Sequence, residues 1–278
     1  MPDTKPELRK KVPMTGRRQE KPADGGDAFK PELDQHFMTD KKLIQRIVSL
    51  AGIRKGETVL EIGAGKGTVT EALSEKAGKV IAVEIDQSLG ERLREKLPEV
   101  DVKVQNALDY LDSHAQSFDR VVSNTPYSIC EALVRRLPYH SFKKGVFAFP
   151  KSFAYRLLEK GEARTSLPFL AQEFFTIKIA LEIPKSAFNP VPHTNSVVVV
   201  LTPKKRKSLV AELLLRDRML LKNALREVLC ETRKSTKREA KEAIKALKIS
   251  RLLLGKKVSD MGEKEFKQVA TIVKRIKI

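Results

Sequence analysis

The segment "VVSNTPYSIC", which begins at Val121, places four residues with hydrogen-bonding or stacking capacity next to one another. Asn124 offers a side-chain oxygen and Thr125 a backbone carbonyl, and each oxygen can accept a hydrogen bond from an amine. Pro126 would fix the backbone that aims this carbonyl, and Tyr127 can stack on a planar base. These four residues, called the tetrad below, also fit an ordinary turn, since Asn and Pro are common turn formers. The other motifs of the chain decide between the two interpretations.

A glycine-rich loop, "EIGAGKG", follows an earlier apolar run and carries Gly63, Gly65 and Gly67. Glycine allows positive φ and lets a ligand approach the backbone closely. A dinucleotide fingerprint would have its glycine one place later, where this chain has Thr68, and Glu61 comes just before the loop. This spacing resembles the S-adenosylmethionine loop of Rossmann-like methyltransferases and disfavours a dinucleotide oxidoreductase.

Two more polar residues end the next apolar runs. Glu84 ends the run in "VEID", where a carboxylate can accept both ribose hydroxyls of a nucleoside cofactor. Asn106 ends the run in "QNA", where its amide could meet an adenine edge while Ala107 packs against the ring. Each residue alone could be a turn residue or a solvated charge. Together with Glu61, at the ends of successive predicted strands, they favour a nucleoside cofactor.

Beside such a cofactor, the tetrad suits methyl transfer to an aromatic amine such as the amino group of adenine. The lone pair of this nitrogen is delocalised into the ring, which makes the amine a poor nucleophile. Two acceptors that each take one N–H would draw the nitrogen toward tetrahedral geometry and free its lone pair for attack. Catalysis would then depend on positioning and placed dipoles rather than on a strong base. The base would have to leave its stack to enter the pocket.

The elements that must position these motifs are strands that alternate with amphipathic helices. Asp40 can cap a first helix with an apolar stripe over 43–50. Apolar runs then predict strands over 58–63, 79–85, 100–107, 118–124 and 144–150, separated in part by helices over 68–77, 88–97 and 128–137. This order predicts an α/β, Rossmann-like fold with a mostly parallel sheet covered on both faces. Ligands of such sheets bind outside the carboxyl ends of the strands, where every motif above falls.

The pattern changes after Phe149. It predicts a helix over 151–160 and two strands, 173–183 and 195–203, at an antiparallel end of the sheet. From about Ser208 the chain is basic and helical, over 209–231, 237–247 and 263–276. We therefore expect a disordered basic arm (1–28), a Rossmann-like methyltransferase domain (29–204) and a small, all-helical, basic C-terminal domain (205–278).

The formal net charge of +19 is concentrated near the C-terminus. From Lys204 to Ile278 the chain has 23 Lys and Arg but 9 Asp and Glu. A basic excess of this kind favours a polyanionic partner, because neutralised phosphates release counterions. A solvated surface or heat adaptation is the alternative, but heat adaptation adds Glu along with Lys. We expect a nucleic-acid partner, which the C-terminal helices would bind through its backbone.

Other features of the sequence limit the class of protein that is possible. No apolar run is long enough to span a membrane, and the first residues lack the apolar core of a signal peptide. Cys130 and Cys230 lie far apart, and no Cys/His cluster has metal-ligand spacing. We expect a cytoplasmic monomer without a metal ion or a disulfide framework.

Taken in order, the motifs resemble those of the rRNA adenine N6,N6-dimethyltransferase family. "DQHFMTD" at Asp34 resembles the Gln-Asn-Phe-Leu segment of the family, and "EIGAGKGTVTEAL", "VEID" and "NTPYSI" follow in the family's order. "SAFNPVPHTNSVVV" resembles its Phe-x-Pro-x-Pro-x-x-x-Ser segment, and "KNALREVL" the start of its helical C-terminal domain. The likeness covers residues 30 to 278.

The resemblance implies S-adenosylmethionine-dependent methylation of adenine N6 in small-subunit (16S) rRNA, with dimethylation of two adjacent adenines near the 3′ end during ribosome biogenesis. It implies that Asn124, Thr125, Pro126 and Tyr127 surround the target amine and that Phe188 is a second aromatic wall for the base. It also implies a set of cofactor-binding residues. This set is Gln35, His36, Phe37, Glu61, Gly63, Gly65, Glu84, Ile85, Asn106, Ala107 and Asn124.

Three residues depart from the pattern of the family. Thr125 stands where Leu or Ile is usual, His36 replaces Asn, and Asn106 replaces Asp. Thr125 would lie beside the amine and could change whether one methyl group or two are added. Phe188 could instead be a core residue, and His36 could approach the first helix without touching a ligand.

Four alternatives stay open. The first is an adenine-N6 methyltransferase that acts on large-subunit rRNA or gives a monomethyl product. The second is a ribosome-assembly factor that binds S-adenosylmethionine without turnover. The third is a methyltransferase for adenine in DNA, because Asn-x-Pro-Tyr also occurs there. The fourth, a cytosine methyltransferase with Cys130 as its nucleophile, is disfavoured because Cys130 lies in an apolar stretch that suits a buried thiol.

Overall fold

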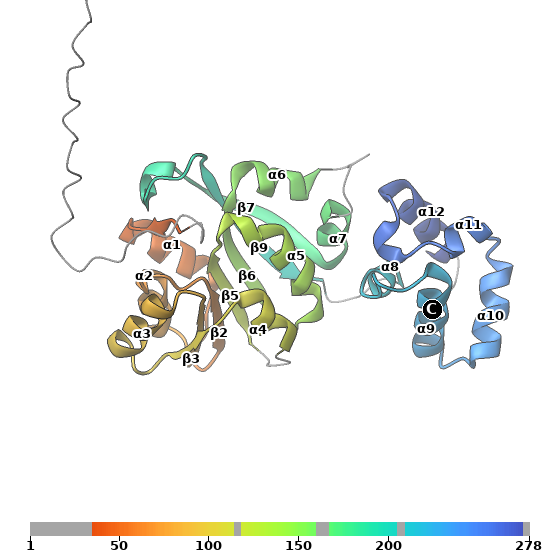
Figure 1. Cartoon of the computed structure of the whole chain (residues 1–278), viewed down its shortest axis with the longest axis horizontal. Coiled ribbons are helices and arrows are strands. Elements are labelled where there is room, and N and C mark those ends of the chain that lie inside the picture. Colours follow the sequence, from red (N-terminus) through yellow and green to blue (C-terminus); the bar gives the residue numbers. More distant parts are fainter. Residues whose placement is uncertain (1–34, 114–117, 160–166, 205–208, 275–278) are drawn as a thin grey trace, which may run out of the picture.

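The computed structural model describes residues 35–113, 118–159, 167–204 and 209–274. These residues form a larger lobe around a central sheet and a smaller lobe of helices (Figure 1). The predicted arm, residues 1–28, lies outside the described residues. The two lobes meet after the last strand of the sheet, close to the predicted boundary at residue 204.

The larger lobe is built on a seven-stranded sheet in the order β4-β3-β2-β5-β6-β9-β7. Strands β2 to β6 are parallel, whereas β9 and β7 are antiparallel to their neighbours. The predicted α/β fold and its antiparallel end are therefore confirmed. The strands are β2 Thr58–Ile62, β3 Lys79–Glu84, β4 Asp101–Val104, β5 Arg120–Asn124, β6 Lys144–Pro150, β7 Phe175–Ile183 and β9 Ser196–Pro203.

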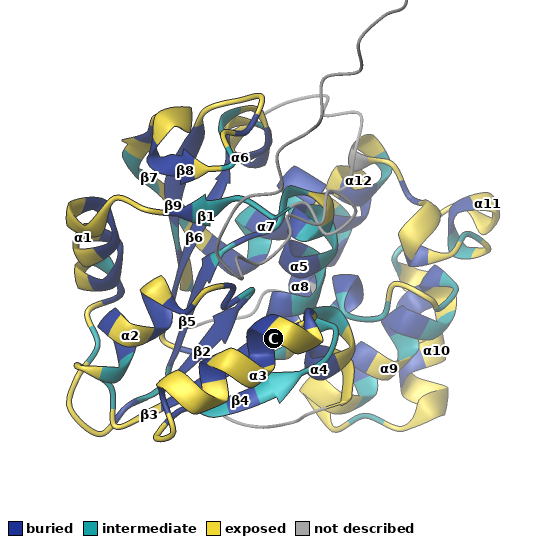
Figure 2. Cartoon of the chain, turned by 60° about the vertical axis from the view of Figure 1, so that its left-hand side comes forward, coloured by how far each residue is buried: buried dark blue, intermediate teal, exposed yellow. Residues whose placement is uncertain are grey.

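Helices cover both faces of the sheet. Successive residues of β2 point to opposite faces, so Val59 packs with α1, α2 and α3, whereas Leu60 packs with α4 to α7. Buried strands therefore lie between helices whose outer sides are exposed (Figure 2). These helices are α1 Lys41–Ala51, α2 Thr68–Ser74, α3 Gln87–Lys96, α4 Ala107–Ser113, α5 Cys130–Arg136, α6 Lys151–Leu158 and α7 Leu167–Phe174.

The first helix forms for the reasons that its sequence indicates. The Asp40 side chain accepts a hydrogen bond from the Leu43 N–H at 3.1 Å, as an N-cap should. Its buried side is apolar, and Gly52 ends the helix in the left-handed conformation (φ 59°). This prediction is confirmed. The sequence patterns did not predict α4 or α7.

A second, two-stranded sheet lies beside the main one. It pairs β1 (Phe37–Met38) with β8 (Phe188–Asn189), two segments that are far apart in the sequence. A 3₁₀ helix, η4 (Lys185–Ala187), leads into β8. This small sheet brings the N-terminal "QHFM" segment next to the "FNPVP" segment, an arrangement that no local pattern predicts.

The smaller lobe contains α8 Leu209–Leu214, α9 Leu221–Arg233, α10 Lys237–Ala246, α11 Arg251–Leu254 and α12 Glu263–Lys274. The helical stretch predicted over 209–231 is wrong in its middle, because the helix is interrupted between α8 and α9. Leu220 is extended there (φ −65°, ψ 139°) and pairs with Lys257, while the Leu221 N–H donates to the Lys256 carbonyl at 2.8 Å. A tertiary contact has therefore overridden the helical pattern.

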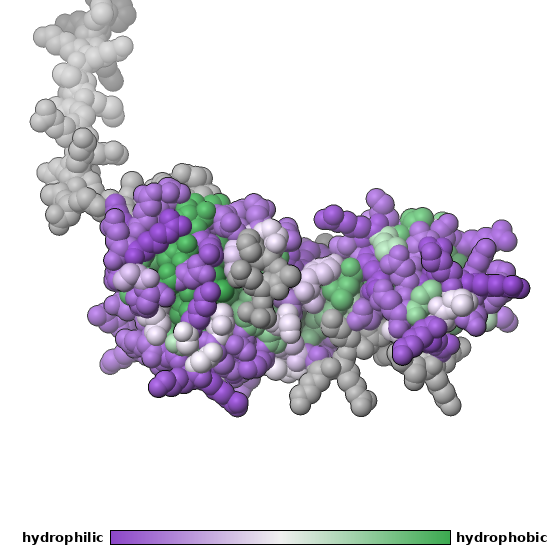
Figure 3. Space-filling model, turned by 90° about the horizontal axis from the view of Figure 1, so that it is seen from below, coloured by the Kyte–Doolittle hydropathy of each residue, from purple (hydrophilic) through white to green (hydrophobic). Residues whose placement is uncertain are grey.

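The two lobes share one apolar core. Phe169 of α7 and Phe266 of α12 contact each other with ring centroids 5.6 Å apart. The Tyr139 hydroxyl donates to the Leu215 carbonyl at 3.2 Å. In the face drawn in Figure 3, apolar residues gather on the larger lobe, whereas the smaller lobe is mostly hydrophilic. Among the described residues, no helix is long and apolar enough to cross a membrane, and no cluster of His, Cys, Asp and Glu could hold a metal ion.

Candidate active site

A cavity of about 200 Å³ opens at the carboxyl ends of β2, β3, β4 and β5. Most of the predicted site residues line it, although they come from distant parts of the sequence. The predicted residues that line the cavity are Gln35, His36, Phe37, Gly63, Gly65, Glu84, Ile85, Asn106, Ala107, Asn124, Thr125, Pro126 and Tyr127. The structure therefore brings the glycine loop and the tetrad to one place.

Phe188 and Glu61 do not line the cavity. Phe188 is 2% exposed and packs in the core beneath α1, opposite Met38 in the small sheet. The structure therefore places this ring in the core and does not bring it to the cavity as a second aromatic wall. Glu61 is 1% exposed and lies within β2, behind the glycine loop.

The Glu61 carboxyl group is buried without a full set of partners. Its Oε2 makes no hydrogen bond within the described part of the chain, and neither does the buried Oγ1 of Thr70. Burial raises the pKa of Glu61 to about 8; the neighbouring Thr70 hydroxyl lowers it in part, and the nearby Glu84 carboxylate raises it further. A buried polar atom without a partner is costly, so this group is suited to a ligand that supplies a positive charge or a donor.

The glycine loop is held by hydrogen bonds to β3 and by contact with β1. The Gly65 N–H donates to Glu84 Oε2 at 2.7 Å, and the Asp86 N–H donates to Glu84 Oε1 at 2.9 Å. Gly65 has a φ of 54°, and a Cβ there would lie 3.0 Å from the Phe37 ring. Burial raises the pKa of Glu84. Glu84 thus accepts hydrogen bonds from the backbone of Gly65, Asp86 and Ile85, and a carboxylate can accept about four, so capacity remains for a ligand.

Two other predicted cofactor residues also have local structural roles. The Leu108 N–H donates to Asn106 Oδ1 at 2.8 Å, so this side chain supports the start of α4. Gln35 Nε2 donates to Asp86 Oδ2 at 3.4 Å. Ile85 is 49% exposed at the rim of the cavity, which is high for an isoleucine and suits a planar apolar ligand.

Each end of the tetrad is tied to a different element. Asn124 Nδ2 donates to the His36 carbonyl at 2.8 Å, so the amide nitrogen is used and the amide oxygen faces elsewhere. The Tyr127 hydroxyl is 2.6 Å from Oγ of Ser196, a buried residue of β9. His36 connects both ends, because its ring centroid lies 5.7 Å from that of Tyr127 and its Nδ1 donates to the Pro190 carbonyl at 2.9 Å.

The middle of the tetrad packs against the glycine loop. Gly63 has a φ of 74°, and a Cβ there would lie 3.2 Å from Cδ of Pro126. Thr125 is 2% exposed, and its hydroxyl donates to Ser123 Oγ at 2.9 Å. The tetrad is therefore a fixed structure that contacts the loop, rather than a solvated turn.

Several residues of the site were not predicted. Ile62 and Val83 complete the apolar wall, and Ser128 and Ile129 extend the tetrad into the 3₁₀ helix η2 (Tyr127–Ile129). Ile62 and Val83 lie at strand ends next to predicted residues, and this position could have identified them from the sequence. Ser196 lies in the quoted "SAFNPVPHTNSVVV" segment, but its bond to Tyr127 requires the fold.

Cys130 does not belong to the cavity. It is 1% exposed, and its thiol donates to the Pro126 carbonyl at 3.6 Å. A nucleophile must reach its substrate, so this position suits a buried structural thiol. The alternative of a cytosine methyltransferase gains no support from the structure.

Comparison with known proteins agrees with this geometry. A probable ribosomal RNA small subunit methyltransferase A of Methanosarcina mazei is 32% identical over 252 residues, which cover 86% of this chain and 91% of the relative. The ribosomal RNA small subunit methyltransferase A of Thermotoga petrophila is 34% identical over 216 residues, covering 73% of this chain and 82% of that protein.

Two solved structures share the fold. A dimethyladenosine transferase from Plasmodium falciparum has a TM-score of 0.60 at 24% identity and covers 84% of this chain and 96% of its own. The 23S rRNA methyltransferase ErmE has a TM-score of 0.57 at 21% identity and covers 86% of this chain and 99% of its own. The model of the family described as ribosomal RNA adenine dimethylase matches residues 26–272. The chain therefore belongs to the ribosomal RNA adenine dimethylase family.

Proposed function

We propose that the protein transfers methyl groups from S-adenosylmethionine to the N6 amino group of adenines in small-subunit rRNA, two to each adenine. Family membership and the names of the relatives support the reaction and the substrate. The observation that carries the proposal is that the tetrad and the glycine loop line one cavity and touch each other at Gly63 and Pro126. The target would be the pair of adjacent adenines that the family resemblance implies. We also propose a cytoplasmic location, which the two widely separated cysteines favour.

The residues present fit the proposed cofactor. Gly65 approaches the Phe37 ring so closely that a side chain would fill the space, and the exposed Ile85 offers an apolar surface for an adenine ring. The unpartnered Glu61 Oε2 lies behind the loop, where a positively charged ligand would compensate its burial. We propose that Glu84 accepts the ribose hydroxyls and that Asn106 and Ala107 meet the adenine.

S-adenosylmethionine, when bound, supplies an electrophilic methyl group on a positively charged sulfur that leaves as a neutral thioether. Asn124 Oδ1 and the Thr125 carbonyl each accept one N–H of the adenine amine and so orient its lone pair. Asn124 Nδ2 is already bonded to the His36 carbonyl, which presents Oδ1 to the cavity. Tyr127 stacks on the base, and its bond to Ser196 fixes the ring. Rate enhancement then comes from orientation and fixed dipoles.

The experiment offers labelled S-adenosylmethionine to small ribosomal subunits that lack this modification, followed by digestion and identification of the labelled nucleoside by mass. We expect N6,N6-dimethyladenosine. Label that appears only on large subunits or on DNA would overturn the substrate. Cofactor binding without any label on RNA would overturn the enzymatic proposal and favour an assembly factor.

For the smaller lobe we propose a role in holding the rRNA backbone. Three lysines of α10, Lys237, Lys241 and Lys245, recur at every fourth residue and lie on one side of the helix. All three are exposed, as is Lys248 just beyond the helix. Phosphate contacts of this kind add affinity without reading sequence.

A charge-matched comparison tests this role. The double variant Lys237→Gln with Lys241→Gln should weaken binding to small subunits and reduce the salt slope of log affinity by about 1–2. The control, Lys55→Gln with Lys76→Gln, removes the same charge from exposed lysines of the larger lobe. Equal effects of the two double variants would contradict a specific role for α10.

A further inference from the structure

The hydroxyl group of Thr125 is bonded inside the protein. It donates to Ser123 Oγ at 2.9 Å, and the Ser123 hydroxyl donates to the Ile62 carbonyl at 2.7 Å. Ser123 is 1% exposed and Thr125 2% exposed, so water does not compete for these bonds. We call these two hydrogen bonds the hydroxyl relay.

The hydroxyl relay connects the strand that leads into the glycine loop with the strand that leads into the tetrad. Ile62 and Ser123 are register partners in the parallel pair of β2 and β5. Ile62 is followed directly by Gly63, and Thr125 is followed by Pro126, which contacts Gly63. A change in the hydroxyl relay would therefore alter the position of the tetrad and the distance between the tetrad and the glycine loop.

The orientation of Thr125 matters because Thr125 lines the cavity. Rotation about its χ1 angle exchanges the hydroxyl with the methyl group, and threonine populates more than one such rotamer. A hydroxyl turned into the cavity would donate a hydrogen bond to the lone pair of the amine, which is the pair needed for attack. The relay uses this donor, so the hydroxyl is not offered to the amine.

The second methyl transfer depends most on this arrangement. The monomethylated amine has one N–H left, so it can bond only one of the two acceptors and is held less firmly. In this transfer the nitrogen forms a bond to the methyl carbon as the bond from that carbon to sulfur breaks. The electron pair of the broken bond stays on sulfur, and the remaining N–H proton leaves to water. An amine whose lone pair is hydrogen-bonded cannot begin this step.

We propose that Ser123 is a positioning residue that keeps the Thr125 hydroxyl out of the cavity and thereby permits the second methyl transfer. The inference rests on the proposed function and deepens it, because it explains how a threonine can occupy this position in an enzyme that adds two methyl groups. It assigns Thr125 and Ser123 together as the determinant of methyl number.

The test measures the first and second transfers separately, in single turnovers of small subunits with excess enzyme. In Ser123→Ala we expect the ratio of second to first rate constants to fall about tenfold, with monomethyladenosine accumulating, while cofactor affinity changes less than about twofold. In Ser123→Ala with Thr125→Val, which keeps the shape but removes the hydroxyl, the ratio should return to near the wild-type value. Should the alanine variant not fold, Ser123→Cys, with a weaker acceptor, gives the same comparison.

The outcomes separate this inference from the proposed function. An unchanged ratio in Ser123→Ala, or a ratio that stays low in the double variant, would overturn the role of the relay while leaving the methyltransferase proposal intact. Absence of any methyladenosine from the wild-type enzyme would overturn the proposed function and this inference together. A selective loss of the second transfer that the valine substitution reverses would establish the role.

Discussion

Two buried glutamates at opposite ends of β2 have opposite chemistry. Glu57 precedes the strand and Glu61 lies near its end, and they are 6% and 1% exposed. Arg120 and Lys143, together with the Arg54 N–H, lower the pKa of Glu57 to about 2, with the Arg120 hydrogen bonds as the largest cause. Burial raises the pKa of Glu61 to about 8. The pKa values of two glutamates at the two ends of β2 therefore differ because their partners differ.

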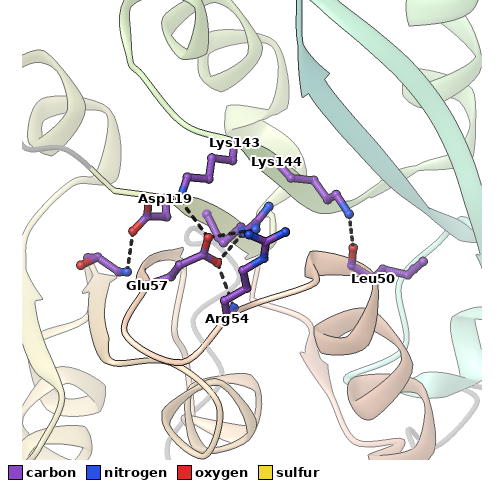
Figure 4. Close-up of polar contacts among 8 residues, drawn as sticks. Leu50, Arg54, Glu57, Asp119, Lys143 and Lys144 are labelled. Carbon is purple, nitrogen blue, oxygen red and sulfur yellow. Dashed lines mark hydrogen bonds and ion pairs between the residues drawn. The ribbon is translucent and has the colours of Figure 1, made fainter.

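Both carboxylate oxygens of Glu57 accept hydrogen bonds from neighbouring residues (Figure 4). Arg120 donates to both carboxylate oxygens at 2.9 and 3.1 Å, and Lys143 Nζ donates to Oε1 at 3.0 Å. The same Lys143 lies 2.9 Å from Asp119. Glu57 thus joins the amino ends of neighbouring strands, whereas Glu61, whose Oε2 has no hydrogen-bond partner in the described part of the chain, lies behind the glycine loop. Complete pairing indicates a structural site, and incomplete pairing indicates a site that a ligand completes.

The largest expected effect comes from a substitution at the carboxyl edge of the sheet, beside the cavity. Asn124→Ala removes a proposed acceptor of the amine, and we expect methyl transfer to fall about 100- to 1000-fold while cofactor affinity stays within a few-fold. Single-turnover methylation and equilibrium binding measure the two quantities. Asn124→Asp is the matched control, because it keeps an acceptor and loses the bond to the His36 carbonyl. Retained activity in the alanine variant would contradict the proposed role of Asn124.

At the opposite edge a substitution should act on stability instead. Arg120→Ala leaves Glu57 buried without its bidentate partner, and we expect the free energy of unfolding to fall by about 3 kcal/mol. Urea denaturation at pH 7 measures this loss. Arg120→Met combined with Glu57→Leu removes both charges and should recover most of it. A loss below about 1 kcal/mol in Arg120→Ala would show that the pairing is weaker than the geometry indicates.

The pH dependence of stability should separate the two glutamates by sign. Glu57 has a lowered pKa, so its contribution is present above its ordinary pKa of 4.5 and is lost as the pH falls toward 2. Glu61 has a raised pKa, so its contribution is present below 4.5 and is lost as the pH rises to about 8. At pH 8.5, the free energy of unfolding of Glu61→Gln should therefore exceed that of the wild type by about 1–3 kcal/mol. A destabilised Glu61→Gln at that pH would contradict the assignment.

The smallest expected effect concerns proton release on cofactor binding. A positively charged ligand favours the ionised form of Glu61, so binding near pH 7 should release a fraction of a proton, and affinity should rise up to about tenfold from pH 6 to 8. Calorimetry in two buffers of different ionisation enthalpy measures the proton count. Glu61→Gln should bind more weakly and show no such dependence. An equal dependence in this variant would assign the proton to another group.

The sequence predicted best what is local. The apolar runs that end at Glu61, Glu84, Asn106 and Asn124 locate the carboxyl edge of the sheet, because parallel strands buried on both faces leave a clear pattern. Nearly every residue predicted to bind the cofactor or to surround the amine then lies around one cavity. The alternation of strands and helices was sufficient for the residues at the strand ends, whereas Gln35, His36 and Phe37 were expected only from the family resemblance.

What could not be predicted depends on contacts between distant segments. Pairing of β1 with β8 sets Phe188 opposite Met38 and keeps its ring in the core, although sequence resemblance suggested a wall of the pocket. Pairing of Leu220 with Lys257 interrupts a helix whose pattern was continuous. The Thr125 hydroxyl has its partner, Ser123, two residues away, but Ser123 is itself bonded to the Ile62 carbonyl across the pair of β2 and β5, a contact between distant segments.

The aromatic contact between Phe169 and Phe266 has a practical consequence for dissecting the molecule. Cutting the chain near residue 204 would expose this contact and the apolar surfaces of α7 and α8 on either side. An isolated larger lobe would then be expected to aggregate, and a loss of activity in it would say little about RNA. A chimera that takes its helical lobe from a relative should carry α7 along with it, so that the exchanged unit brings both halves of the shared core.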